Sequence, residues 1–128
     1  MKKILNLVIT KKWFDMIKSG EKTEEYREIK SFWLNRLLLI KNKDGEKYRK
    51  FHVRKFDGIL FDAFTIKQGI EIGTLKVAPF THVLFRNGYH KYSPRIEKEI
   101  KTITFGKPKK GMCPDEWLAA EFIIIKFK

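Results

Sequence analysis

The sequence predicts one α+β domain in which two helices near the N-terminus flank a mostly antiparallel β-sheet. Three observations predict this. The chain has 128 residues, which suits one domain. Hydrophobic residues make up 43% of the sequence and aromatic residues 14%, which is enough to form a core. Apolar residues follow helical spacing in two early segments. After residue 55 they form short β-type runs separated by turn residues.

The first third of the chain alternates between strand and helix. Residues 5–9 are apolar and β-type, which predicts the first strand. Thr10 suits the N-cap of a first helix, and Gly20 suits the left-handed residue that ends it. We expect a second strand at residues 23–27 and a second helix capped by Ser31.

The rest of the chain is predicted to be mostly β-strand, because β-branched and aromatic residues concentrate there. The predicted strands are residues 56–64, 71–77, 81–85, 96–105 and 122–127. In the fourth of these, apolar residues change from even to odd positions, which predicts a β-bulge near Lys101. Strands at this spacing are typical of a barrel or a sandwich.

The charge is the strongest compositional signal. The chain has 28 Lys and Arg against 15 Asp and Glu, a formal net charge of +13. Such an excess favours RNA, DNA or an anionic membrane surface as partner, although it also suits a merely soluble domain. No apolar run approaches the roughly 18 residues of a membrane span, so we expect no membrane association. Without a secretory signal, and with Cys113 as the single cysteine, a cytoplasmic location is expected.

The segment from Gly20 to Arg27 concentrates reactive side chains. If Thr23 begins a strand, then Thr23, Glu25 and Arg27 share one face, because side chains alternate with period two. Arg27 could clamp a phosphate, and Glu25 could orient Arg27 or act as a base. Lys22 could contact a phosphate or serve as nucleophile or base if burial lowers its pKa. The alternative is a solvated cluster of weak ion pairs.

This segment resembles the GxKxxExR signature of the ASCH family, in the form Gly20-x-Lys22-x-x-Glu25-x-Arg27. The preceding helix with Trp13-Phe14 and the later residues 85–89 are also similar to that family. The resemblance implies a PUA-like β-barrel with a cleft lined by the signature, and binding of RNA or of a modified nucleotide. It implies one ASCH domain over residues 1–128, with a hairpin-like insertion within 41–79.

One branch of the family hydrolyses the amide of N4-acetylcytidine with a Lys, a Thr and a Glu. By this resemblance the Lys falls on Lys22, whereas the Thr position holds Glu25. The alternative function is therefore a small amidohydrolase or an RNA-cleaving enzyme that uses Lys22 and Glu25. The place of a second carboxylate stays open between Asp62, Glu71 and Glu97.

A second candidate segment follows the strand at 81–85. Asn87-Gly88 predicts a tight turn. With the family resemblance, we expect Arg86 to pair with a phosphate, Asn87 to lie at the ligand site, and Tyr89 to stack on a base.

The remaining candidates carry structural or electrostatic roles. Trp13 and Trp33 are interpreted as core residues. The basic stretch 41–55 could guide a nucleic-acid backbone, extended by Lys107, Lys109 and Lys110. His52, His82, His90 and Cys113 lack metal-ligand spacing, so no metal or cofactor is predicted.

Overall fold

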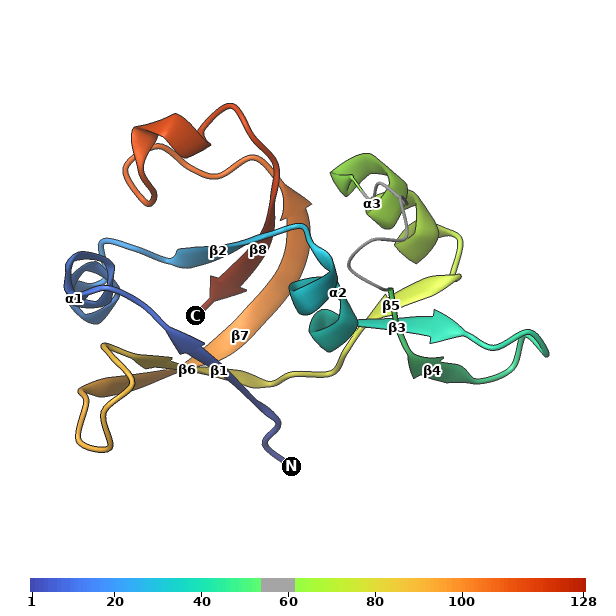
Figure 1. Cartoon of the computed structure of the whole chain (residues 1–128), viewed down its shortest axis with the longest axis horizontal. Helices are drawn as coiled ribbons and strands as arrows, with labels where there is room; N and C mark the ends of the chain where they lie inside the picture. The colour runs from blue at the N-terminus through green and yellow to red at the C-terminus, as the bar shows by residue number, and fades with distance from the viewer. Residues whose placement is uncertain (54–61) are drawn as a thin grey trace.

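The computed structural model describes residues 1–53 and 62–128, and their strands form two sheets (Figure 1). The larger sheet has the order β1-β6-β7-β8-β2, and the smaller has the order β4-β3-β5. β1 and β6 are parallel, and the other pairings are antiparallel. The larger sheet comprises β1 (Ile4–Val8), β2 (Glu24–Glu28), β6 (His82–Arg86), β7 (Arg95–Gly106) and β8 (Phe122–Phe127). An α+β fold with mostly antiparallel strands is thus confirmed, although the larger sheet is mixed.

The long strand β7 determines the shape of the larger sheet. Its first half pairs with β6 and its second half pairs with β8, so one strand serves both halves of the sheet. The register shifts between Ile100 and Thr102, which confirms the predicted bulge, and β7 curves strongly (Figure 1). β1 and β2 are the two edge strands of this sheet, and within the described residues no pairing between them is found. Closure of the sheet into a barrel therefore stays a prediction.

The two predicted N-terminal helices are present. α1 (Lys11–Ser19) joins β1 to β2 and buries Phe14 and Ile17. Gly20 ends it with a φ of 90°, where a side chain would be strained, as the sequence predicts. α2 (Ser31–Leu37) buries Leu34 and Leu37, but its N-cap is Lys30 and not the predicted Ser31.

Residues 38–77 differ most from the sequence-based expectation. They contain β3 (Leu38–Lys41), β4 (Tyr48–Lys50), α3 (Ala63–Glu71) and β5 (Leu75–Val77). The predicted strand at 56–64 is wrong at residues 62–64, because Asp62 caps α3 and the helix begins at Ala63. Its residues 56–61 lie outside the described part. The strand predicted from residue 71 starts at Leu75, because the helix extends to Glu71.

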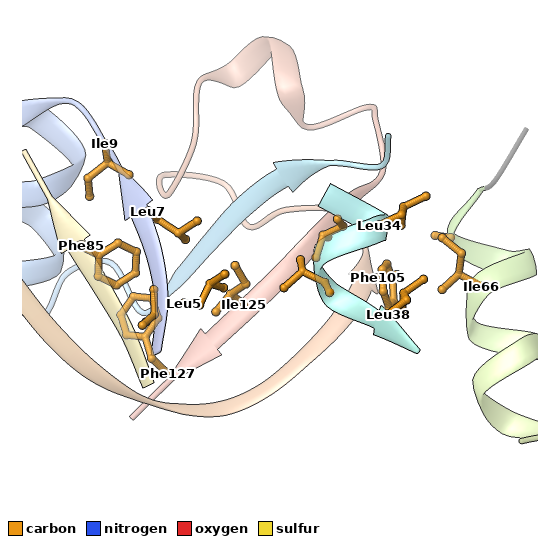
Figure 2. Packing of buried hydrophobic residues seen from close by; sticks show 14 of the residues in the cluster. Leu5, Leu7, Ile9, Leu34, Leu38, Ile66, Phe85, Phe105, Ile125 and Phe127 are labelled. Carbon is orange, nitrogen blue, oxygen red and sulfur yellow. The ribbon is translucent and has the colours of Figure 1, made fainter. Parts of the chain in front are cut away.

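A hydrophobic core runs from the larger sheet to α3 (Figure 2). It joins residues of β1, α2, β7 and β8, including Leu5, Leu34, Phe105 and Ile125, to Ile66 on α3. A smaller cluster of Tyr26, Cys113, Phe122 and Ile124 packs against Met112, Trp117 and Leu118. This cluster holds the loop before β8 against β2, and so fixes the wall of the cavity described next.

Within the described ranges, no helix is long and apolar enough to cross a membrane.

Candidate functional site

A cavity of about 680 Å³ lies where the two edges of the larger sheet approach each other. Four segments of the chain line it: residues 8–13 at the end of β1 and the start of α1, residues 22–27, residues 87–89, and residues 112–117. This volume falls in the range of small-molecule sites. The start of α1 adds the positive end of a helix dipole to the wall, where Thr10 makes no side-chain cap hydrogen bond.

Lys22 is buried in the wall of this cavity, with 1% of its surface exposed. Its Nζ donates a hydrogen bond to the Met112 carbonyl and lies 3.3 Å from the Glu25 carboxylate. The same atom lies 5.2 Å from the ring centre of Trp13 and 4.8 Å from that of Tyr26. Burial lowers the pKa of the Lys22 ammonium, and attraction to Glu25 opposes that change. The amine is therefore easier to deprotonate than an exposed lysine.

Glu25 connects two cations. Its Oε1 faces the Lys22 Nζ and accepts a hydrogen bond from the Tyr26 amide at 3.0 Å. Its Oε2 accepts from the Arg27 Nη1, also at 3.0 Å. The side chain is only 7% exposed, so this carboxylate is compensated by protein groups and not by bulk water.

Arg27 links the two edge strands. Its Nη1 donates to the Tyr26 carbonyl at 2.9 Å, and its Nη2 donates to the Val8 carbonyl on β1 at 3.1 Å. The guanidinium also lies 5.3 Å from the ring centre of Trp33. Because both terminal nitrogens already donate to the protein, Arg27 spans the sheet edges as well as lining the cavity.

The opposite face of β2 anchors the loop before β8. The Tyr26 hydroxyl donates to Glu24 at 3.1 Å and accepts from the Lys109 amide at 3.0 Å. The Lys109 ammonium lies 3.4 Å from Glu24, and burial raises the pKa of Tyr26, so its hydroxyl stays protonated. The loop fixed in this way presents the Met112 carbonyl to Lys22.

Aromatic rings line the cavity around these charges. Trp13 is half-buried and packs against the hydrophobic core, as the sequence predicts, and it also contributes to the cavity wall. Trp117 also lines the cavity and stacks on Phe122 at 4.9 Å with an interplanar angle of 19°. Cys113 is a buried free thiol in the same wall, and burial raises its pKa.

Residues 7–109 match the family model of the ASCH domain. The chain belongs to the ASCH domain family. The matched residues include three of the four segments that line the cavity, whereas residues 112–117 follow the matched range. A search of the curated proteins and a search of the solved structures each found no match.

The ASCH signature and the Asn-Gly turn converge on this cavity. Lys22, Glu25, Arg27, Asn87 and Tyr89 all line it. Two other predicted site residues do not: Thr23, which is exposed beside the Met112 sulfur, and Arg86, which donates to the His90 carbonyl at 2.9 Å. The ligand roles assigned to all seven stay predictions.

None of the three candidates for a second carboxylate lines the cavity. Asp62 accepts from the Thr65 amide as the N-cap of α3, Glu71 lies exposed at the end of that helix, and Glu97 pairs with Lys2. Glu25 is the single carboxylate in the wall of this ASCH cavity, as far as the described ranges extend.

Sequence reasoning missed the contribution of Met112, Cys113, Pro114 and Trp117. They belong to no motif, and their place in the wall depends on packing between β2 and a loop about ninety residues away in the sequence. Across residues 1–53 and 62–128 of the chain, no group of three or more His, Cys, Asp or Glu could hold a metal ion.

Proposed function

We propose that this ASCH domain binds RNA or a modified nucleotide, with one base in the cavity. The observation that carries the proposal is a charged pair, Lys22 and Glu25, in a cavity that the aromatic rings of Trp13 and Trp117 also line. Aromatic rings offer faces on which a base can stack. A carboxylate accepts hydrogen bonds from an exocyclic amino group, and amines and helix N-termini attract phosphate.

Several finer assignments belong to the same proposal. The curved five-stranded sheet is taken as a PUA-like barrel whose edges are linked by Arg27. Residues 1–128 are taken as one domain, with residues 41–79 as an insertion. The net charge of +13 supports a polyanionic partner, and the proposed location is the cytoplasm.

Titration calorimetry tests the binding proposal. The wild-type protein is titrated with cytidine, N4-acetylcytidine and the four ribonucleoside monophosphates. We expect at least one of them to bind, and Lys22→Met to weaken its binding about tenfold or more, because a charge-assisted contact is lost. The matched control is Glu28→Gln, an exposed charge at the end of β2, the strand that follows Lys22. Absence of binding to the wild type, or equal binding by Lys22→Met, would contradict the proposal.

A second candidate function is hydrolysis of an acylated nucleoside such as N4-acetylcytidine. It is favoured by the buried Lys22 amine, whose pKa is lowered and which lies 3.3 Å from Glu25. The neutral amine would take a proton from water as the water oxygen attacks the acetyl carbonyl. Glu25 would relay that proton to N4 as the C–N bond breaks, which yields acetate and cytidine.

Product analysis separates the two candidates. Incubation with N4-acetylcytidine, followed by chromatography, should release cytidine from the wild type and none with Lys22→Met if the enzyme is an amidohydrolase. Binding without product formation would remove this candidate and leave the binding function. Cleavage of a labelled RNA, run in parallel, tests the RNA-cleaving alternative.

A further inference from the structure

Two tyrosines project from the hairpin loop that joins β6 to β7, beside the cavity. We propose that this loop, residues 87–94, is a stacking platform for single-stranded RNA. The cavity then takes one nucleotide of a strand and not a free nucleoside. The inference rests on the proposed function and names the form of ligand that the same site accepts.

The two tyrosine rings are unusually accessible. Tyr89 is 87% exposed and Tyr92 is 81% exposed. Tyrosine side chains in folded proteins are normally buried at least in part by other residues. Tyr89 also lines the cavity, so the platform begins at the cavity wall. Tyr92 follows three residues later in the same loop, which places a second ring for the next base of a strand.

The loop holds these rings on an ordered backbone. The Asn87 amide donates to the Pro94 carbonyl at 2.9 Å, and the Ser93 amide donates to the His90 carbonyl at 3.0 Å. Gly88 has a φ of 108°, which a residue with a side chain would rarely adopt. A loop held by its own hydrogen bonds loses less conformational entropy when a ligand binds.

The arginines at the two ends of the loop add further ties. Arg86 donates to the His90 carbonyl, and Arg95 donates to the Lys91 carbonyl at 2.6 Å. Both guanidinium groups are thereby tied to the backbone of the loop.

The charge of the loop matches a phosphate backbone. Residues 86–95 contain Arg86, Lys91 and Arg95 and no acidic residue. The Lys91 ammonium lies 5.6 Å from the ring centre of Tyr92, so a cation accompanies the second ring. In general, proteins recognise a single strand by stacking its bases on aromatic rings and pairing its phosphates with cations. Protein interfaces, in contrast, deplete lysine at their centre.

The other basic candidate lies elsewhere. The hairpin of β3 and β4 carries residues 41–50 of the basic stretch predicted to guide a nucleic acid, and residues 54 and 55 of that stretch lie outside the described part. This hairpin lies at the opposite end of the molecule from α1 and the cavity (Figure 1). The loop at 87–94 therefore provides a basic and aromatic surface that adjoins the cavity.

Binding of a short RNA tests the platform. Affinities for a labelled single-stranded RNA of about ten nucleotides and for the best-binding mononucleotide are measured with wild type, Tyr92→Ala and Phe64→Ala. We expect Tyr92→Ala to weaken binding of the RNA by roughly five- to 150-fold, the effect of losing one base–aromatic stack, and to leave the mononucleotide affinity unchanged. Phe64, an exposed aromatic residue on α3, is the matched control and should change neither affinity.

The outcomes distinguish the platform from the function on which it rests. If Tyr92→Ala binds the RNA as the wild type does, while Lys22→Met loses the mononucleotide, the platform is overturned and the binding function stands. The loop is then better explained as a docking surface for a protein. If the wild type binds neither ligand, the proposed function itself fails.

Discussion

At the scale of single residues, Glu25 determines the electrostatics of the cavity. It lies between Lys22 and Arg27, and all three side chains are largely removed from water. Each cation alone would carry a large desolvation cost, which the shared carboxylate offsets. The burial of both cations therefore depends on one acidic side chain.

Removing that charge should destabilise the protein. Glu25→Gln leaves two cations without their counter-ion, so we expect the free energy of unfolding to fall by about 3 kcal/mol. Urea denaturation measures this change. Glu28→Gln, which alters an exposed pair with Lys30 at 3.8 Å, should change it by less than about 0.5 kcal/mol. Equal effects of the two substitutions would show that the buried network contributes nothing.

The lowered pKa of Lys22 predicts a pH dependence of stability. Burial disfavours the ammonium in the folded state, so the unfolded chain binds more protons between the folded pKa and the ordinary lysine value of 10.5. The charged, buried Lys22 therefore lowers the free energy of unfolding at low pH. This loss is recovered as the pH rises through that window. The free energy of unfolding of wild type minus that of Lys22→Met should therefore increase as the pH rises toward 10.5.

The slope of that difference has an upper limit of about 1.4 kcal/mol per pH unit, because one proton is involved. Tyr26 and Cys113 act in the opposite direction at higher pH, since their pKa values are raised, and they are present in both proteins. A difference that stays constant or falls with pH would contradict a depressed pKa at Lys22.

The residue pattern around Lys22 was partly predictable. Period-two alternation correctly places Glu25 and Arg27 together, because it depends on local backbone geometry. The hydrogen bond from Lys22 to Met112 was not predictable, since it joins residues 90 positions apart and depends on how a loop packs. The same holds for Trp13, whose apolar helix position fits a core residue and a cavity wall equally well.

At the scale of elements, β2 carries the cavity on one face and its support on the other. The Tyr26 hydroxyl connects Glu24 to the Lys109 amide and so ties the loop before β8 to the strand. That loop supplies the Met112 carbonyl that holds Lys22. The position of the amine therefore depends on a tyrosine that does not line the cavity.

Tyr26→Phe tests this support. It removes a buried hydroxyl and leaves the Lys109 amide and Glu24 without that partner, so we expect a loss of about 1–3 kcal/mol in the free energy of unfolding. Hydrogen exchange should become faster at the amides of Lys109 and Met112. Tyr48→Phe, which removes a hydroxyl that donates to the Gly73 carbonyl, is the control and should leave exchange at those two amides unchanged. Unchanged exchange in Tyr26→Phe would show that the loop is held by packing alone.

The elements that the sequence predicts well are those with a strong local signal. α1 has a helical apolar face and a terminal glycine, and the bulge in β7 follows from a change of apolar phase. The helix α3 was missed because Gln68-Gly69 is typical of a turn. In the structure Gly69 lies inside the helix, where a Cβ would come within 2.7 Å of the Leu75 side chain. Tertiary packing, and not turn formation, explains that glycine.

At the scale of the whole molecule, the cavity and the three-stranded sheet lie at opposite ends (Figure 1). The net charge of +13 is distributed over both, so charge alone does not locate the ligand. The parallel pairing of β1 with β6 and the approach of β1 to β2 are long-range features. No local pattern predicts them.

Salt dependence should distinguish local from overall charge. We expect the affinity for single-stranded RNA to fall with ionic strength, and Lys91→Gln to reduce the slope of log K against log salt by about 0.7, the value for one phosphate contact. Lys50→Gln on β4, at the other end of the molecule, should leave the slope unchanged. Equal reductions by both variants would indicate binding by overall charge without a defined path.

All three tryptophans of the chain belong to one neighbourhood, since Trp13 and Trp117 line the cavity and Trp33 lies against Arg27. The intrinsic fluorescence of the unlabelled protein therefore originates almost wholly from this region. A ligand that enters it, or a substitution that rearranges it, changes the emission directly. The molecule thus carries its own optical reporter, with which a library of nucleosides can be screened in a plate reader.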